Sequence, residues 1–308
     1  MPASQKKAYL LVILGVVMVS YSGPLVKGAL LQDATPVTVA FLRMLFSGLL
    51  LLPFSLRKRE GETRSSLSAV LHAPMRELFF GLLAAVFLAL HYYTWMTSLK
   101  STSTFASVAL VCTQPLFVAA FSGLLLHEPM QKSARPGALV ALLGALLIGA
   151  NSLGGLGGDI GGDLMALLGA VAMAGHWLCG RHARQNMPAL GYTVFVYLAT
   201  AFILAILLPL GGGFRLPGGA VWYLCGLVLG CTLLGHAVFT YTLGMVSAHV
   251  VSFALLGEPV GAMLWALLMF DEKPGTLLLI GGAVVLLGLF MYLKAQAGRE
   301  AKAEKASI

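Results

Sequence analysis

The sequence predicts an all-α polytopic membrane protein with ten transmembrane helices, arranged as two inverted five-helix repeats. Three observations predict this fold class: an apolar composition, apolar runs long enough to span a bilayer, and an internal repeat. Hydrophobic residues make up 58% of the 308 residues and charged residues only 10%, with a mean hydropathy of +0.88. Soluble domains are about a quarter charged, so this chain cannot cover itself with a polar surface.

The net charge of +8 is distributed as a membrane topology signal, because the basic residues fall in short clusters between apolar segments. No basic stripe interleaved with aromatic residues occurs, so we expect no nucleic-acid partner. The four cysteines lie inside apolar segments, which favours small core residues over a disulfide or zinc framework. We therefore expect neither a metal nor a cofactor.

Apolar runs, divided at charge, proline and glycine, give ten candidate spans. A bilayer core of about 30 Å needs roughly 20 helical residues. The spans cover approximately residues 8–30, 37–56, 76–98, 103–126, 136–151, 162–181, 190–210, 220–243, 247–270 and 275–294. The first is long enough to cross the bilayer and lacks a small-residue cleavage site, so no cleavable signal peptide is expected.

Lysine and arginine set the expected orientation, because cytoplasmic flanks carry an excess of both. With the N-terminus in the cytoplasm, fifteen basic residues flank the inner side and four the outer side. The outer four are Lys27, Lys100, Arg215 and Lys273, and Arg43 lies inside a span. We expect a multi-pass protein of the cell (inner) membrane with both termini in the cytoplasm.

The second half of the chain repeats the first. A shift of 144 positions lays residues 92–149 on 236–293 without a gap. The matches include Pro115 with Pro259, Glu128 with Glu272, Gly137 with Gly281 and Gly144 with Gly288. Each repeat has an odd number of spans, so the second copy enters from the opposite side. Inverted repeats build secondary transporters, although channels can also be symmetric.

Four segments follow from the repeat. They are a first five-helix repeat at 1–151, a glycine-rich connector at 152–161, a second five-helix repeat at 162–294 and a charged cytoplasmic tail at 295–308. Glu128 and Glu272 are expected at helix ends, where they satisfy backbone amides or pair with lysines. Gly281, Gly288 and the alanines of the sixth span permit close helix contact.

Three segments resemble the EamA-type members of the drug/metabolite transporter superfamily. They are DATPVTVAFLRMLFSGLLLLP at 33–53, SLKSTSTFASVALVCTQPLF…HEP at 98–129 and TLGMVSAHVVSFALLGEPVGAML…DEKP…GGAVVLLG at 242–288. The resemblance covers essentially the whole chain as two tandem EamA-like domains. It implies ten helices around a central cavity, with export or exchange of amino acids and other small metabolites.

Glu258 lies inside an apolar run, where an acidic side chain costs roughly 2.5–3.5 kcal/mol. It is a candidate to bind a substrate amine or a proton, with Gln114 opposite it. Pro259 removes a helix hydrogen bond and is expected to kink its span, as is Pro115 in the counterpart. Alternatively, Glu258 and Gln114 are buried hydrogen-bonding groups that hold two kinked helices together. The resemblance favours this structural role, because glutamate–proline looks like a general family feature.

Arg43 lies about seven residues into the second span, roughly 10 Å deep. It is a candidate to clamp a substrate carboxylate or to pair with Glu258. The alternatives are outward snorkelling and a bond to a helix terminus. The family pattern carries an arginine here irrespective of cargo.

The segment HYYTWMTS at 91–98 is unusually polar and aromatic for a span. His91 and Trp95 are four apart and share a helix face, while Tyr92 lies on an adjacent one. This face would suit a flat or cationic ligand beside a cavity. Aromatic residues also gather at membrane interfaces, which is the alternative.

Two further spans carry polar and aromatic insertions, His176 with Trp177 and His236 with Tyr241. All four residues are candidates to contact substrate. Histidine titrates near neutral pH, so a proton relay is one interpretation. An interhelical hydrogen bond is the other.

These features favour a secondary transporter that moves a small metabolite across the cytoplasmic membrane by alternating access. We expect an amino acid or related compound as cargo, and export as the direction. No HExxH, Gly-x-Ser-x-Gly, CxxC or P-loop pattern occurs, so we expect no enzyme. A membrane-embedded enzyme and a channel or scaffold remain the alternatives. Expected partners are the small-molecule substrate and the lipid bilayer, with protons as a further candidate and a monomer as the candidate assembly.

Overall fold

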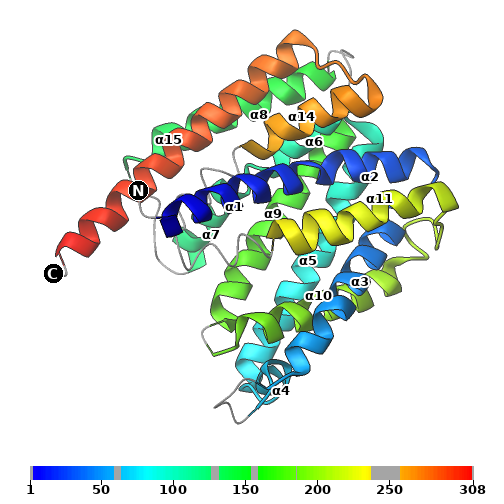
Figure 1. Ribbon diagram of the computed structural model, residues 1–308. Helices are drawn as coiled ribbons and strands as arrows, with labels where there is room; N and C mark the ends of the chain where they lie inside the picture. The colour runs from blue at the N-terminus through cyan, green and yellow to red at the C-terminus, as the bar shows by residue number, and fades with distance from the viewer. Residues whose placement is uncertain are drawn as a thin grey trace. The chain divides into compact units, whose positions relative to one another are not determined.

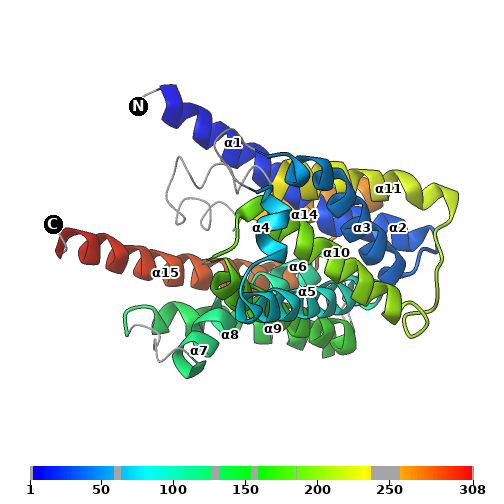
Figure 2. The same ribbon diagram turned by 90° about the horizontal axis from the view of Figure 1, so that it is seen from below.

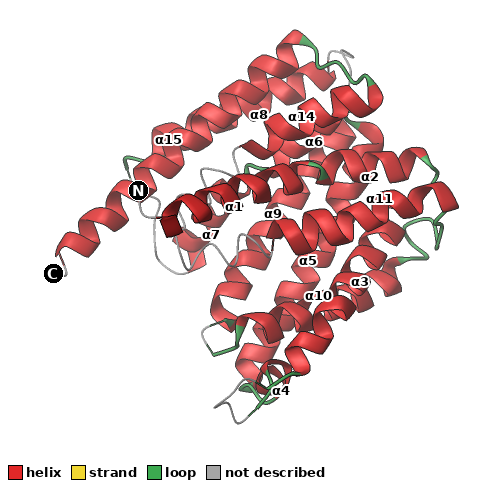
Figure 3. Cartoon of the chain, in the orientation of Figure 1, coloured by secondary structure: helices red, strands yellow, loops and turns green. Residues whose placement is uncertain are grey.

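The computed structural model describes residues 3–58, 64–125, 132–153, 159–184, 186–236 and 257–306. Within these ranges every regular element is a helix, and Figure 3 shows no strand there. The helices are α1 (Ala3–Ser20), α2 (Ser22–Leu31), α3 (Pro36–Leu56), α4 (Ser66–Leu71), α5 (Met75–Ser101), α6 (Thr104–Val111), α7 (Gln114–Leu125), α8 (Arg135–Leu153), α9 (Ile160–Ala183), α10 (Ala189–Leu207), η1 (Gly218–Ala220), α11 (Val221–Cys225), η2 (Gly226–His236), α14 (Gly257–Phe270) and α15 (Thr276–Ala306).

An apolar helical segment lies within each predicted span. Six are long enough to cross a membrane: Leu10–Leu31, Pro36–Leu56, Met75–Ser101, Ile160–Ala183, Ala189–Leu207 and Gly218–Gly235. Four are shorter: Thr104–Val118, Arg135–Ile148, Gly257–Phe270 and Thr276–Tyr292. The prediction of an all-α polytopic membrane protein is confirmed.

The chain packs as two compact units, and each takes helices from both sequence repeats. Unit 1 comprises Met1–Pro24, Ser98–Leu167 and Gly230–Ile308. Unit 2 comprises Leu25–Thr97 and Leu168–Leu229. The repeats at 1–151 and 162–294 are therefore units of sequence, while the packing units cut across them.

Two predicted spans are interrupted, and a proline accounts for each interruption. In the first span, α1 ends at Ser20 and α2 begins at Ser22. Pro24 cannot donate to the Ser20 carbonyl, which removes the bond that would join them. Residues 112–113 likewise separate α6 from α7, because Pro115 cannot donate to the Val111 carbonyl. The helix thus stops and restarts at the place where a kink was predicted, with Pro115 in the first turn of α7.

Two other elements differ from the sequence prediction. The described part of the eighth span contains π-helical η2, over Gly226–His236, rather than regular α-helix. Such turns are rare and occur often at functional sites. The charged tail expected after residue 294 is not separate, because α15 continues to Ala306 as one helix.

Helices α8 and α15 form the closest-packed helix pair of unit 1 and lie side by side in Figures 1 and 2. Their glycines let the two backbones meet. A Cβ placed on Gly288 would lie 2.7 Å from the Gly137 carbonyl oxygen, and one on Gly144 would lie 2.7 Å from the Gly281 carbonyl oxygen. Real Cβ contacts are never that short, so only glycine fits this interface, which we call the glycine seam.

The glycine seam has the symmetry expected of an inverted repeat. A shift of 144 positions moves Gly137 to Gly281 and Gly144 to Gly288, so the pair 137/288 becomes 281/144. Rising numbers on α8 meet falling numbers on α15, which makes the helices antiparallel. Corresponding helices of the two repeats therefore run in opposite directions.

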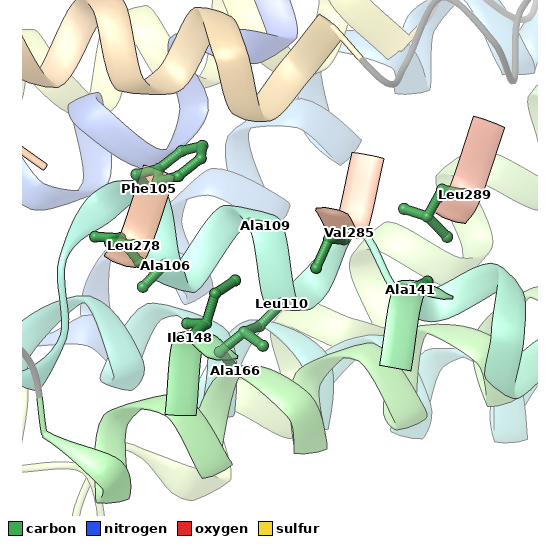
Figure 4. Packing of buried hydrophobic residues seen from close by; sticks show 10 residues of the cluster. All are labelled: Phe105, Ala106, Ala109, Leu110, Ala141, Ile148, Ala166, Leu278, Val285 and Leu289. Carbon is green, nitrogen blue, oxygen red and sulfur yellow. The ribbon is translucent and has the colours of Figure 1, made fainter. Parts of the chain in front are cut away.

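A buried apolar core of unit 1 surrounds the seam. Figure 4 shows its members, Phe105, Ala106, Ala109, Leu110, Ala141, Ile148, Ala166, Leu278, Val285 and Leu289. Glu272 fixes α6 against this core as expected for a helix end. Its carboxylate accepts hydrogen bonds from the Thr104 backbone N–H at 2.7 Å and the Thr104 hydroxyl at 2.8 Å.

Unit 2 is built around α3, which packs most extensively on α10. Gly48 of α3 faces Leu198 of α10, where a Cβ would lie 3.0 Å from the Leu198 Cγ. Leu42 of α3 packs with Leu224 and Val228 in a second apolar cluster. This packing leaves Arg43, the next residue on α3, directed into unit 2.

Candidate functional site

Arg43 is a buried cation in unit 2. Its side chain is 1% exposed, which excludes outward snorkelling. The guanidinium carbon lies 5.1 Å from the centroid of the Tyr92 ring on α5, over its face. A desolvated cation–π contact of this kind contributes about 2 kcal/mol. The charge is therefore held at a fixed place in the apolar interior.

Three rings on one turn of α5 surround that contact. The His91 and Trp95 rings stack with centroids 5.7 Å apart and an interplanar angle of 11°. Tyr92 is tilted against both, at 5.1 Å from His91 and 6.2 Å from Trp95. The shared face of His91 and Trp95 is confirmed. We call Arg43, His91, Tyr92 and Trp95 the arginine–aromatic cluster.

Two histidines connect α5 and α9 through main-chain carbonyls. His91 Nδ1–H donates to the Gly169 oxygen at 2.9 Å, and His176 Nδ1–H donates to the Ala84 oxygen at 3.0 Å. The carbonyls can only accept, so Nδ1 carries the proton in both rings. His176 thus makes the interhelical hydrogen bond that was the alternative to a relay, and His91 makes a bond of the same kind. Nε2 of each ring keeps a lone pair that can accept a proton.

Gly169 permits the approach that His91 needs. A Cβ at this position would lie 3.2 Å from the Trp95 Cβ and 3.3 Å from the Thr94 hydroxyl oxygen. These distances are tighter than nearly all natural contacts. The absence of a side chain on α9 therefore places Trp95 and His91 against its backbone.

The remaining candidates are Trp177 of unit 2 and the eighth-span residues His236 and Tyr241. Trp177 is 50% exposed and contacts His176 edge to face at 5.4 Å, so it turns away from α5. The His236 side chain and all of Tyr241 lie outside the described residues. Their contact with substrate stays a prediction.

Glu258 and Gln114 belong to unit 1. Glu258 is part-buried near the start of the described α14, close enough to Cys112 for an electrostatic interaction. Gln114 begins α7, two residues after Cys112, and its buried Oε1 has no hydrogen-bond partner among the described residues. Both lie by the α6–α7 interruption. Arg43 lies in the other unit, so its pairing with Glu258 stays a prediction.

Sequence reasoning missed two aromatic residues beside these candidates. Tyr197 of α10 is close enough to Arg43 and Tyr92 to interact electrostatically. Trp265 of α14 donates from Nε1 to the Ser20 hydroxyl at 3.0 Å. Tyr197 could have been found as a tyrosine in the middle of an apolar span. Trp265 could have been found because it follows Glu258 by seven residues, a spacing that repeats a helix face.

Comparison with known proteins now places the chain. The model of the EamA-like transporter family matches residues 6–150 and 160–294. The chain belongs to the EamA-like transporter family. This membership makes it a multi-pass membrane transporter.

One relative of this EamA-like transporter is "Uncharacterized transporter YdfC" of Bacillus subtilis (strain 168). The two are 26% identical over 270 residues, which is 86% of this chain and 84% of the relative. A crystal structure of another protein has the same fold, with a TM-score of 0.62 at 19% identity over 94% of this chain and 97% of that one.

The chemistry available in unit 2 of this EamA-like transporter is that of binding. A guanidinium group can hold a carboxylate through two hydrogen bonds. Aromatic faces can hold an apolar or cationic group beside it. Within the described ranges no three His, Cys, Asp or Glu side chains gather as metal ligands.

Proposed function

We propose that this transporter moves an amino acid, or a related small amphipathic metabolite, out of the cell across the cytoplasmic membrane. Arg43 binds the substrate carboxylate in this proposal, and His91, Tyr92 and Trp95 bind the side chain. Glu258 and Gln114 in unit 1 are separate candidates to bind an amine or a proton, and His176, Trp177, His236 and Tyr241 are further candidate substrate contacts.

The observation that carries the proposal is the arginine–aromatic cluster. An arginine buried to 1% exposure inside apolar helices is costly, and such groups generally serve a substrate path or a partner. Its contact with Tyr92 is made through the face of the guanidinium, whereas a guanidinium binds a carboxylate through its edge. Stacked aromatic rings on the same turn supply the apolar half of an amphipathic site.

The antiparallel α8–α15 pair supports transport by alternating access. Two inverted repeats can exchange conformations, so that an inward-open form becomes outward-open by adopting the partner's arrangement. We place both termini in the cytoplasm on the excess of lysine and arginine there. Protons are the candidate coupling ion, through Glu258 or a histidine Nε2.

A solute screen in proteoliposomes tests the proposal. The purified full chain is reconstituted, and uptake of labelled amino acids and their decarboxylated amines is measured with and without a pH gradient. Trp95→Phe is compared with Trp222→Phe, because Trp222 lies on α11 of the same unit and is 81% exposed. Saturable, nucleotide-independent uptake that only Trp95→Phe impairs supports the proposal.

Three results would contradict it. Flux that rises without saturation would indicate a channel. Conversion of a solute to a product would indicate a membrane-embedded enzyme. Saturable transport equally sensitive to both tryptophan changes would keep the transporter and remove the cluster from its site.

A further inference from the structure

Six exposed basic residues gather at one end of unit 2. They are Arg57 and Lys58 after α3, Arg64 before α4, Arg76 in the first turn of α5, and Arg181 and Arg184 around the end of α9. We call this set the basic rim. Figure 1 shows α4 at this end, beside the termini of α3 and α5.

Contacts between helices hold the members of the basic rim at the same end. The Phe80 ring of α5 lies 4.2 Å from the His182 ring of α9. Asn186, after α9, donates from Nδ2 to the Glu77 Oε1 at 2.9 Å, next to Arg76. Gly191 of α10 donates its N–H to the Ser66 hydroxyl of α4 at 2.9 Å. The ends of four helices therefore meet here.

Few carboxylates lie near the basic rim in the described part of unit 2. In the described part of unit 2 the carboxylates are Asp33 and Glu77, and Asp33 lies at the other end. Glu77 is 9% exposed, and Asn186 occupies one of its two oxygens. Glu60 and Glu62 lie outside the described residues, and with Glu77 they give these segments three carboxylates against the six basic residues of the rim, so the net charge stays positive.

Exposed apolar side chains lie among these cations. They are Phe54 and Leu56 at the end of α3, Leu71 at the end of α4, and Met75 and Phe79 at the start of α5. Met75 is 79% exposed and precedes Arg76 directly. A soluble anion gains nothing from such neighbours, whereas a lipid presents a charged headgroup and an acyl chain together.

At the opposite end of unit 2, the exposed arginine is part of an ion pair. Arg215 pairs with Asp33, with Nη2 and Oδ2 3.6 Å apart. The Arg215 main chain is also tied down, because its N–H donates to the Thr38 hydroxyl at 3.1 Å and its carbonyl accepts from the Thr35 N–H at 3.1 Å. This arginine therefore already has its counter-ion.

We propose that the basic rim is a binding site for the headgroup of an anionic phospholipid. Arg64 and Arg76 hold the phosphate, and Met75 and Phe79 line the path of an acyl chain. The site is separate from the arginine–aromatic cluster, so it stands whether or not the proposed cargo is right.

Lipid titration of the full chain tests this site. The protein is titrated with phosphatidylglycerol, with phosphatidylcholine of the same chain length, and with inorganic phosphate, and bound ligand is counted by native mass spectrometry. The test variant is Arg64→Gln with Arg76→Gln. The matched control, Lys27→Gln with Arg215→Gln, removes two positive charges from the opposite end.

Each cation near an anionic lipid surface contributes about fivefold in affinity, so the test variant should bind phosphatidylglycerol about 25-fold more weakly. The control should change by less than about twofold, because its charges are remote from the rim. Arg64→Lys with Arg76→Lys should retain most of the affinity. Thermal unfolding in phosphatidylcholine checks that every variant is folded.

Three outcomes would overturn the proposal. Equal losses in test and control variants would mean that net charge alone attracts the lipid. Equal affinity for phosphatidylglycerol and phosphatidylcholine would remove the role of charge. Displacement of lipid by inorganic phosphate at the same concentration would make this a soluble-anion site.

Discussion

Two antiparallel helix pairs, α8–α15 and α5–α9, are held together by different kinds of contact. In unit 1, α8 and α15 meet through glycines, and backbone lies against backbone. In unit 2, α5 and α9 meet through His91 and His176, each of which donates to a carbonyl of the facing helix. Lipid tails give helices no hydrophobic reason to associate, so close packing or hydrogen bonding must hold them.

The difference separates a structural interface from one that can take part in binding. The glycine seam has no polar side chain, and its contacts are too short to admit any group larger than hydrogen. The α5–α9 interface keeps imidazole, indole and phenol groups on the turn that faces Arg43. We therefore expect changes in the seam to reduce the amount of folded protein, and changes at α5–α9 to alter transport.

The largest effect is expected for Gly288→Val. The new side chain would collide with the main chain of Ala141 and Gly137 on α8, which cannot move without separating the helices. Overpacking costs about 1–3 kcal/mol, and more where backbone must shift. The monodisperse fraction in size-exclusion chromatography and the Tm should both fall sharply.

Gly218→Val is the matched control for the seam. A Cβ on Gly218 has no neighbour within 4 Å, so this variant should stay within about 0.5 kcal/mol of the wild-type stability. A wild-type Tm for Gly288→Val would mean that α8 and α15 can separate without loss of stability. It would contradict the structural role of the glycine seam.

The next largest effect is expected for Arg43→Leu, on transport. Removing the guanidinium leaves a substrate carboxylate without its charged donor, which costs about 1.5–3 kcal/mol, or about 10- to 150-fold in apparent affinity. Arg43→Lys keeps the charge and loses the two-pronged geometry, so it should retain part of the uptake. Uptake in proteoliposomes is the measurement.

A decarboxylated substrate distinguishes binding from structure for Arg43. If Arg43 holds the carboxylate, the amine analogue should be transported equally by wild type and Arg43→Leu. An identical loss for both solutes would assign Arg43 to maintaining α3 against Tyr92, and substrate contact would have to be sought elsewhere.

A smaller effect is expected for Trp95→Phe. The change keeps an aromatic ring on the α5 face but shortens the surface stacked on His91. Aromatic pairs contribute about 0.5–1.5 kcal/mol, so uptake should weaken about two- to tenfold. Trp222→Phe on the exposed face of α11 should leave uptake within about twofold. Equal effects would show that the α5 face is no more sensitive than the unit's surface.

Sequence alone predicted the helices well because membrane-spanning length and apolar composition are local properties. The glycine matches Gly137/Gly281 and Gly144/Gly288 also indicated close contact, and the seam uses all four. The interruptions at Tyr21 and at residues 112–113 were missed. A proline in a span permits either a kink or a break, and the outcome depends on neighbouring helices.

The sequence predicted only part of the arginine–aromatic cluster. The spacing of His91 and Trp95 predicted their common face, because residues four apart are neighbours on any helix. Gly169 and Tyr197 could not be assigned to the cluster from the sequence. The residues around them do not show that α9 packs beside α5 or α10 beside α3. The role of the cluster in binding substrate is a prediction that the uptake measurements test.

The smallest effect, and the sharpest test of the α5–α9 interface, is expected for His176→Asn. An asparagine amide can replace Nδ1–H and still donate to the Ala84 carbonyl, so Tm should stay near the wild-type value. His176→Leu removes that donor, and membrane hydrogen bonds of this kind contribute about 0.6 kcal/mol on average. His91→Asn gives the same test at Gly169, beside Arg43.

The pH dependence of uptake then decides what the histidines do. Asparagine keeps the hydrogen bond but cannot take up a proton at physiological pH, so a purely structural histidine predicts an unchanged pH profile in both variants. A flattened profile in His91→Asn alone would make Nε2 of His91 the proton carrier. Because its Nδ1 stays bonded to Gly169, that proton would enter and leave beside the Arg43 charge, which would couple protonation to the binding of an anionic group.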